Sequence, residues 1–276
     1  MRSARRGTVS HPIRRALLGL LLGFLALGSS CTSWRQGGIG TELAATVSEI
    51  QPLHDRDHYV YVWQRLIDGK RSAEGVQVEH VTALPTSGEF EITITEDGTP
   101  AGRLRVAIDA QNLSLLEEDD LTQGIRLSYS PPLPQLIAPV LVGEQSGTAR
   151  ASIERIEDGS RMNEVEVSQT TRIRRAGKVE SEVGTYSNGI ALRTRRRLQT
   201  PAGAIELENA LVLVPGIGEI RSEGSTSATL TAAPQAEETH SIITRRELAC
   251  AIIAGKAIGD CRLVPERIAR MRADAE

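Results

Sequence analysis

The sequence is short of large rings. Aromatic residues make up only 3% of its 276 positions, so a core must be filled by smaller side chains. It also lacks the biased composition of collagen or of disordered chains, because 40% of its residues are apolar and 24% are charged. Excess positive charge is missing too. Five of the 32 basic residues and none of the 35 acidic residues precede residue 31. The body of the chain, residues 31–276, therefore has a formal net charge of −8. This negative body argues against nucleic acid as the main partner.

The N-terminus has the layout of an export signal. Five arginines precede an apolar run of 12 residues (16–27), which ends in Gly28, Ser29 and Ser30. At ~1.5 Å per residue the run covers roughly 18 Å, which is too short for a hydrocarbon core of about 30 Å. A basic start, a short apolar stretch and small residues after it predict a secretory signal peptide over residues 1–30. A buried or membrane-spanning helix is the alternative.

The end of this segment, Leu27–Cys31, resembles the lipobox of bacterial lipoproteins, in which the cysteine after the cleavage site is acylated. It departs from the family pattern at Gly28, where a leucine is usual. The resemblance implies a mature chain that begins at Cys31 and is held in a membrane by several acyl chains, which together give lasting attachment. Thr32 rather than aspartate follows, which in that family suggests passage to the outer membrane. The alternative is an ordinary signal peptide cut near Ser30 and a soluble periplasmic or secreted protein.

The two remaining cysteines form an even pair. If Cys31 is lipidated, Cys250 and Cys261 remain in an oxidising compartment, and the loop between them is short enough to close. We therefore expect a Cys250–Cys261 disulfide. Two free buried thiols are the alternative, and a metal site is disfavoured because no histidine or further cysteine lies nearby.

Composition divides the mature chain into three parts. Residues 31–56 are small, polar and marked by glycines, which is typical of a flexible tether between an anchor and a domain. Residues 57–248 hold the strand-like segments. Residues 249–276 contain an apolar, alanine-rich stretch and then a proline followed by good helix formers, which predicts one or two short helices.

Turn signals predict antiparallel pairing throughout the central part. Asp-Gly occurs at 68–69, 97–98 and 158–159, each time between strand-like runs. Most of these runs alternate apolar and polar residues, so each strand should have one buried face; they are 76–81, 90–95, 103–108, 149–156 and 165–170. The predicted fold is mainly β: a single antiparallel curved sheet or open barrel built from hairpins. Whether it closes depends on strand shear, which turns do not reveal.

Two segments qualify this prediction. Four prolines fall within residues 131–139, and we expect a connection there rather than a regular ladder. The segment 215–220, with proline followed by two glycines in an apolar setting, resembles a strand ending found in β-rich periplasmic proteins. That resemblance implies a curved sheet or an open barrel like that of lipoprotein carriers of the LolA and LolB kind, and it names no catalytic residue.

Three aromatic residues are the first candidates for ligand binding. Tyr59, Tyr61 and Trp63 share one face of a predicted strand, because side chains alternate with period two. Core packing is their expected structural role. If the concave face of the sheet holds an apolar ligand, the same residues would contact it.

The arginine run 193–197 is the second candidate, because it could bind phosphate-bearing lipid or another anionic envelope polymer. If the turn at 201–203 pairs residues whose numbers sum to 403, Arg197 faces Glu206 and Arg195 faces Glu208. Arg196 then points toward the side of Leu207. Either the register is off by one, or Arg196 lies on a face that is not fully dry, and we keep it as a ligand candidate.

No motif has catalytic spacing. His54 and His58 would be about 13 Å apart on an extended chain at ~3.3 Å per residue, so a solvated loop is favoured over a metal pair. Gly216 and Gly218 lack the third glycine and the helix start of a nucleotide-binding loop. We therefore expect no enzyme activity, no metal and no cofactor.

These observations predict a lipid-anchored envelope protein with a periplasm-facing β domain that acts as a binding or envelope-assembly module. An apolar ligand in the sheet's concave face is one candidate, and the membrane is reached through the N-terminal lipid. One alternative is a structural protein that binds another envelope protein through a sheet edge. Another is a hydrolase whose catalytic residues are scattered along the sequence and meet only in the fold.

Overall fold

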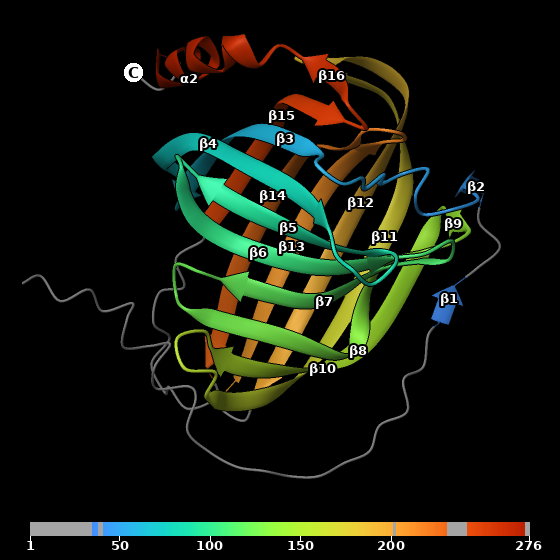
Figure 1. Cartoon of the computed structure of the whole chain (residues 1–276), viewed down its shortest axis with the longest axis vertical. Helices are drawn as coiled ribbons and strands as arrows, with labels where there is room; N and C mark the ends of the chain where they lie inside the picture. The colour runs from blue at the N-terminus through green and yellow to red at the C-terminus, as the bar shows by residue number, and fades with distance from the viewer. Residues whose placement is uncertain (1–34, 38–40, 201–202, 231–241, 274–276) are drawn as a thin grey trace, which may run out of the picture.

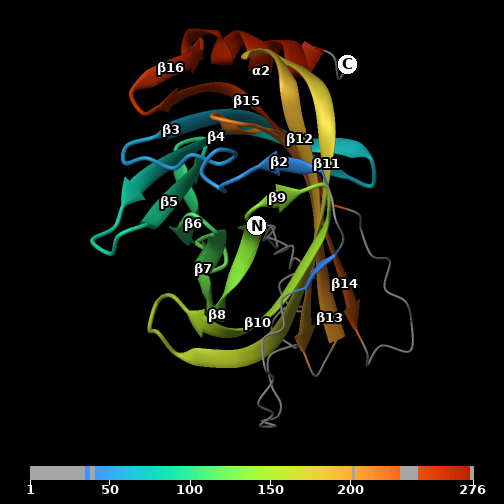
Figure 2. The ribbon, with the colours of Figure 1, turned by 90° about the vertical axis from the view of Figure 1, so that its right-hand side faces the viewer.

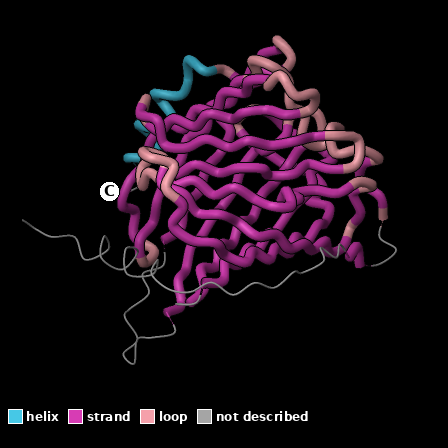
Figure 3. The backbone as a smooth tube through the Cα atoms, turned by 60° about the horizontal axis from the view of Figure 1, so that its bottom comes forward, coloured by secondary structure: helices cyan, strands magenta, loops and turns pink. Residues whose placement is uncertain are grey.

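The computed structural model describes residues 35–37, 41–200, 203–230 and 242–273. The predicted signal peptide, Cys31 and the turn at 201–202 lie outside these ranges. Strand is the dominant structure (Figure 3), and among the described residues no helix has the length and apolarity needed to cross a membrane.

Antiparallel strands form a closed barrel. In the order in which they neighbour one another, the strands are β10 (Gly143–Arg155), β11 (Arg161–Ser181), β12 (Gly184–Thr200), β13 (Gly203–Val214), β14 (Gly218–Leu230), β15 (Ile242–Ile253), β3 (His58–Ile67), β4 (Lys70–Ala83), β5 (Glu89–Glu96), β6 (Thr99–Ile108), β7 (Asn112–Asp120) and β8 (Ile125–Ile137). The ring closes where β8 pairs with β10. The prediction of a mainly β antiparallel fold is confirmed, and the sheet closes on itself.

Figure 1 shows the barrel as two halves, with β4 to β8 in front and the steeper strands β11 to β14 behind. Shorter elements are added outside the ring: β1 (Arg35–Gly37) beside β10, β16 (Lys256–Gly259) beside β15, and a separate pair of β2 (Glu42–Ala44) and β9 (Val140–Leu141). Figure 2 shows the long strands β11 and β12 bending at their upper ends toward the C-terminal helix α2 (Val264–Ala273).

The Asp-Gly turns explain much of the pairing. Asp68 and Gly69 have φ of 51° and 76°, and Asp97 and Gly98 have φ of 48° and 79°. Positive φ at both central positions is what the tight hairpin turn requires, and Asp and Gly tolerate it best. Four of the five strand-like runs named from the sequence lie wholly in strands, and the fifth, 149–156, lies in β10 except for its last residue.

The proline-rich segment differs from its prediction in part. Residues 131–137 are the second half of β8, and Leu133, Pro134, Leu136 and Ile137 pair with β7, so this part is strand and not a connection. The ladder between β8 and β10, however, ends at the pair Ser130 and Arg150, directly before Pro131. Beyond that point side chains bridge the gap: Gln145 hydrogen-bonds to the backbone N and O of Ile137, and Gln169 Nε2 donates to the carbonyl of Pro134. Prolines lack the N–H that a ladder needs, which accounts for the split.

The segment predicted as a flexible tether is partly folded. Val47 and Ile50 have no exposed surface and pack in one cluster with Ile173, Ile190 and Leu213. Residues 42–53 therefore cover one end of the barrel. The polar, glycine-marked composition of residues 31–56 predicted a tether. The segment nevertheless contains three apolar residues spaced three apart, Val47, Ile50 and Leu53.

The C-terminal prediction is half right. Helix α2 lies where proline and good helix formers predicted it, after the 3-10 turn η2 (Cys261–Leu263). Residues 249–259 are strand and not helix, because β15 continues to Ile253 and turns through Ala254 and Gly255, with φ of 48° and 76°, into β16. Alanine favours helix in isolation, but here pairing with β3 and β16 determines the structure.

The disulfide is present in the structure. Cys250 on β15 is bonded to Cys261, with their Cα atoms 5.2 Å apart, and it ties η2 and α2 to the barrel. Beyond the disulfide, Val264 and Ile268 of α2 pack on Val60 and Val62 of β3. The disulfide therefore fixes the place where the helix docks.

Reduction of this disulfide should lower the free energy of unfolding by about 3 kcal/mol, because it releases a loop of roughly a dozen residues in the unfolded chain. Denaturant unfolding of the oxidised and the reduced protein measures this loss of free energy. The Cys261→Ser variant, which cannot form the disulfide, is the control, because reductant should not change its unfolding midpoint. An unchanged midpoint on reduction would show that the bridge adds nothing to stability.

Candidate functional site

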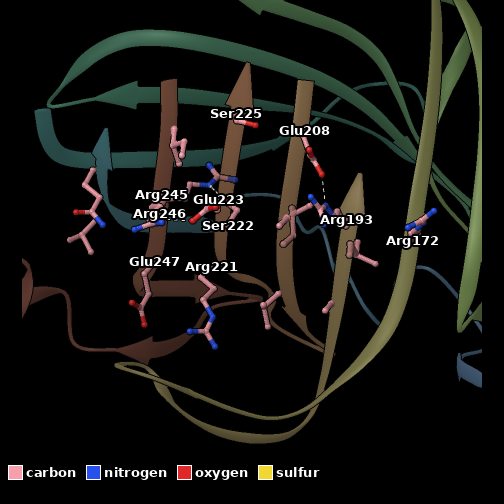
Figure 4. Close-up of a pocket in the computed structure, with 18 of the residues that line it drawn as sticks. Arg172, Arg193, Glu208, Arg221, Ser222, Glu223, Ser225, Arg245, Arg246 and Glu247 are labelled. Carbon is pink, nitrogen blue, oxygen red and sulfur yellow. Dashed lines mark hydrogen bonds and ion pairs between the residues drawn. The ribbon is translucent and has the colours of Figure 1, made fainter. Parts of the chain in front are cut away.

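A groove of about 1030 Å³ lies on the outer face of the barrel, across β11 to β15, β3 and the start of β4 (Figure 4). Its lining contains seven arginines and three glutamates, and one of these arginines, Arg246, has its guanidinium on the inner face, bound to Glu219. This excess of positive charge contrasts with the negative charge of the whole body. A groove of this kind attracts anions.

Register explains how the groove is built. On the outer face of each strand, every second residue comes into line with its neighbours across the sheet. One row runs from Arg172 on β11 through Arg193 and Ala210 to Glu223 and Arg245 on β15. Its arginines are paired. Arg172 Nε is 2.9 Å from Glu144, Arg193 pairs with Glu208 on the next row, and Arg245 pairs with Glu223.

The adjacent row is different. It runs from Arg174 on β11 through Ala191 and Val212 to Arg221 on β14 and Glu247 on β15. Both arginines are exposed, and neither is within 4.0 Å of a carboxylate among the described residues. The floor between them is small and apolar. Two guanidinium groups thus line the groove without a hydrogen-bond partner in the part of the chain that the structure describes, and each could bind a carboxylate or phosphate in bidentate fashion.

The bent tip of the β11–β12 hairpin contacts the C-terminal helix (Figure 2). Glu182 in this tip lies 3.0 Å from Arg267 and 3.8 Å from Arg270, both on α2. Burial lowers the pKa of Arg267, and Glu182 partly offsets this effect. The hairpin and the helix are therefore held together by charge as well as by packing.

The aromatic candidates lie inside the barrel. Tyr59, Tyr61 and Trp63 are on one face of β3, as predicted, and are 2%, 2% and 5% exposed. Tyr59 and Tyr61 are stacked, with ring centroids 6.5 Å apart. Trp63 has a cation–π contact with Arg65 at 5.3 Å, and its Nε1 has no hydrogen-bond partner within the described part of the chain. The structure places these three residues in the core, away from the outer groove.

Arg196 also points into the barrel. The predicted register is confirmed: Arg197 pairs with Glu206 and Arg195 with Glu208, each at 3.8 Å on the outer face. Arg196 lies on the opposite face, which is not dry. Its Nη1 donates to Glu118 at 2.8 Å and to the hydroxyl of Tyr129 at 3.2 Å, and its Nε donates to Gln169 at 3.1 Å.

This network spans the interior. Glu118 and Tyr129 lie on β7 and β8, in the front half of the barrel, whereas Arg196 lies on β12 in the back half. Burial disfavours the charged guanidinium, but Tyr129 and Glu118 outweigh that effect and raise the pKa of Arg196 above its usual value. Arg196 is therefore a strut between the two halves.

A second partly buried arginine on the inner face was not foreseen from the sequence. Arg246 on β15 donates from Nε and Nη2 to the two carboxylate oxygens of Glu219, both at 2.7 Å, and from Nη1 to Glu79. Its guanidinium lies 4.5 Å from the ring centroid of Tyr61. The one signal in the sequence is the neighbouring pair Arg245 and Arg246, which a strand places on opposite faces of the sheet.

His54 and Asp57 stabilise the loop before β3. Asp57 is 1% exposed and accepts hydrogen bonds from the backbone N of His54 and of Ala254, at 3.0 and 2.8 Å, and from Nδ1 of His54 at 3.1 Å. His58 packs instead against His80, with ring centroids 5.9 Å apart. In the described ranges no cluster of three or more His, Cys, Asp or Glu side chains is arranged to hold a metal ion.

This histidine pair predicts a pH dependence. Burial, and then the neighbouring His80, lower the pKa of His58 below its usual value. The folded protein then binds fewer protons than the unfolded chain as the pH falls below about 6.5, so this residue should reduce stability between roughly pH 7 and pH 5. The slope of unfolding midpoint against pH should be shallower in His58→Gln and in His80→Gln. Equal slopes in wild type and both variants would contradict this prediction.

The comparisons with known proteins assign no family to this chain. No family model and no curated protein matches the sequence. A solved "putative exported protein with YmcC-like fold" from Bacteroides fragilis is 14% identical, covers 75% of this chain and 98% of its own, and has a TM-score of 0.39. A solved "putative lipoprotein" from Parabacteroides distasonis is 12% identical, covers 76% of this chain and 100% of its own, and has the same TM-score of 0.39. Those descriptions belong to the two proteins named, and the resemblance to LolA and LolB stays a prediction.

Proposed function

We propose that this protein is a lipid-anchored component of a bacterial envelope, facing the periplasm, and that it binds an anionic ligand in the outer groove. The observation that carries the proposal is the row Arg174, Ala191, Val212 and Arg221: two exposed arginines without ion-pair partners among the described residues, separated by an apolar floor. On a body of negative net charge, such a groove is where an anion should be attracted most strongly.

The envelope location is supported by the N-terminal sequence. A basic start, a short apolar run and a cysteine directly after small residues are what an exported lipoprotein needs. The Cys250–Cys261 disulfide also fits an oxidising compartment. The expected location is the outer membrane, with the alternative of a soluble periplasmic protein.

The groove is a better binding site than the barrel interior. The interior is filled by the protein's own side chains: Tyr59, Tyr61, Leu133 and Leu248 are at most 2% exposed. Its two inward-pointing arginines, Arg196 and Arg246, already have carboxylate partners. An apolar ligand could enter only if this packing moved.

Binding of another protein through a sheet edge is less well supported. The ring of strands from β10 round to β8 is closed, so its strands pair on both sides along most of their length. Unpaired edges remain on short elements such as β16, which has four residues. A closed ring removes the long edges that strand addition uses.

The binding test compares dextran sulfate with neutral dextran of the same length. The full mature protein should bind fluorescent dextran sulfate and not dextran. Arg174→Glu combined with Arg221→Glu should weaken binding about tenfold or more, because two charge-assisted contacts become repulsive. The matched control is Arg161→Glu, which lies on β11 like Arg174 but at its other end.

Two outcomes would contradict the proposal. One is dextran sulfate binding that the double substitution leaves unchanged; the other is no binding at low ionic strength, where attraction between exposed charges is strongest. The anchor is tested separately by the intact mass of the protein from native membranes, which should show a chain starting at Cys31 with added acyl mass. An unlipidated chain in the soluble fraction would overturn the anchor.

A further inference from the structure

We infer that the ligand is extended and carries two anionic groups, phosphate or carboxylate, which Arg174 and Arg221 bind at the same time across the Ala191–Val212 floor. This inference rests on the proposed function and specifies its ligand class. It excludes a compact single anion as the preferred ligand.

The spacing follows from the sheet. Arg174, Ala191, Val212 and Arg221 are consecutive cross-strand neighbours on β11, β12, β13 and β14. Three strand spacings of about 4.8 Å place the two outer Cα atoms about 14 Å apart. The register is regular across this row, because the nearest irregularities begin beyond it, after Arg175 on β11 and between Val212 and Leu213 on β13.

The side chains between and around the two arginines favour this arrangement. Ala191 and Val212 offer no charge and little height, so a ligand can cross them without losing hydrogen bonds to a polar floor. The neighbouring row cannot replace the pair, since Arg193 and Arg245 are already bound to Glu208 and Glu223. Glu247, the next residue along the row after Arg221, would repel a third anionic group there.

The two contacts should reinforce each other. Once one anionic group is bound, the second is held near its own arginine at a high effective concentration, and a linked pair can bind roughly a hundredfold more tightly than a single group. A flexible arginine side chain broadens the range of lengths that fit. The gain should nevertheless disappear when the linker is too short to span the floor.

The experiment uses the full mature protein and a series of linear bisphosphates whose extended spacers bracket about 14 Å, with phenyl phosphate as the single anion. Affinity should rise roughly a hundredfold once the spacer spans the row. Arg174→Gln and Arg221→Gln should each remove this rise, so that long bisphosphates bind like phenyl phosphate. Arg174→Lys should restore part of it, and Arg161→Gln should leave it intact.

The outcomes separate this inference from the proposed function. Tight binding that depends on Arg174 and Arg221 but not on spacer length would overturn the inference and leave the anionic groove in place. No binding of any phosphate probe, together with no binding of dextran sulfate, would overturn both. A second arm compares soluble long-chain polyphosphate with vesicles of phosphatidylglycerol: binding to the former alone assigns the two anions to a polymer, and binding to vesicles assigns them to lipid headgroups.

Discussion

Replacing Arg246 by leucine is expected to destabilise the protein by about 3–5 kcal/mol, the largest effect of any single substitution proposed here. The reason is the charge left behind. Glu219 is 6% exposed and loses both of its guanidinium hydrogen bonds, and Glu79 loses its own. A domain is typically stable by only about 5–15 kcal/mol. The Arg246→Leu variant should therefore lose a large part of its stability at room temperature.

The adjacent residue is a matched control. Arg245 lies on the outer face of the same strand, is 48% exposed and pairs with Glu223. Its replacement by leucine should cost no more than about 1 kcal/mol, because exposed ion pairs contribute little. Denaturant unfolding at constant m-value measures both variants. Equal destabilisation of Arg245→Leu and Arg246→Leu would contradict a buried role for Arg246.

The electrostatics of this cluster agree with its geometry. Burial alone would lower the pKa of Arg246, but attraction to Glu219 and Glu79 outweighs it and raises that pKa above its usual value. Burial raises the pKa of Tyr61, and the two glutamates raise it further. The guanidinium is thus the only positive partner of two carboxylates among these residues, which is why its removal is expected to be costly.

Replacement of Arg196 by methionine is the second large effect, with an expected loss of about 2–3 kcal/mol. This loss is smaller than the one expected for Arg246→Leu, because Glu118 keeps 36% of its side chain exposed and can be partly solvated after its partner is removed. The Glu118→Gln variant should cost less than Arg196→Met. The double variant should recover roughly 1 kcal/mol relative to the sum of the singles, because the two side chains interact directly.

This substitution also separates two roles for Arg196. As a ligand residue, its loss would weaken binding and leave the unfolding free energy unchanged. As a strut, its loss should lower stability and leave the affinity for dextran sulfate within about twofold, because it lies on the inner face, away from the groove. A stable Arg196→Met variant with lost binding would contradict the account of the interior.

The sequence predicted the local features of the fold well. Asp-Gly pairs marked tight hairpins because the required backbone conformation is local. The register between β12 and β13 followed from one turn and from opposite charges facing each other at Arg197 and Glu206. The unexplained position of Arg196 was itself a correct signal, since it indicated a barrel face that is not fully dry.

Features that depend on distant contacts could not be predicted. Closure of the barrel requires β8 to pair with β10, and no local pattern in the sequence shows that these two strands meet. Their ladder ends directly before Pro131, and the sequence does not show which strand loses its partner there. Residues 249–253 were read as helix because alanine is a good helix former, whereas pairing with β3, almost two hundred residues earlier in the chain, makes them strand. Contacts of this range override local propensity.

The groove was missed for the same reason. Arg174 on β11 and Arg221 on β14 are unremarkable in sequence, each one charge among many. Only the register of four strands brings them into one row with Ala191 and Val212. The sequence did indicate arginine-based binding of an anion, but at residues 193–197, where ion pairs and the interior account for the side chains.

Arginine footprinting tests the central claim, binding in the outer groove, most directly. The full mature protein is treated with phenylglyoxal, with and without dextran sulfate, and modified sites are located by mass spectrometry. Arg174 and Arg221 should react readily alone and be protected by dextran sulfate, while Arg196 and Arg246, which are 14% and 21% exposed and ion-paired, should react much less and to the same extent in both conditions. Unchanged reactivity of Arg174 and Arg221, or ligand-dependent changes confined to Arg196 and Arg246, would contradict the account.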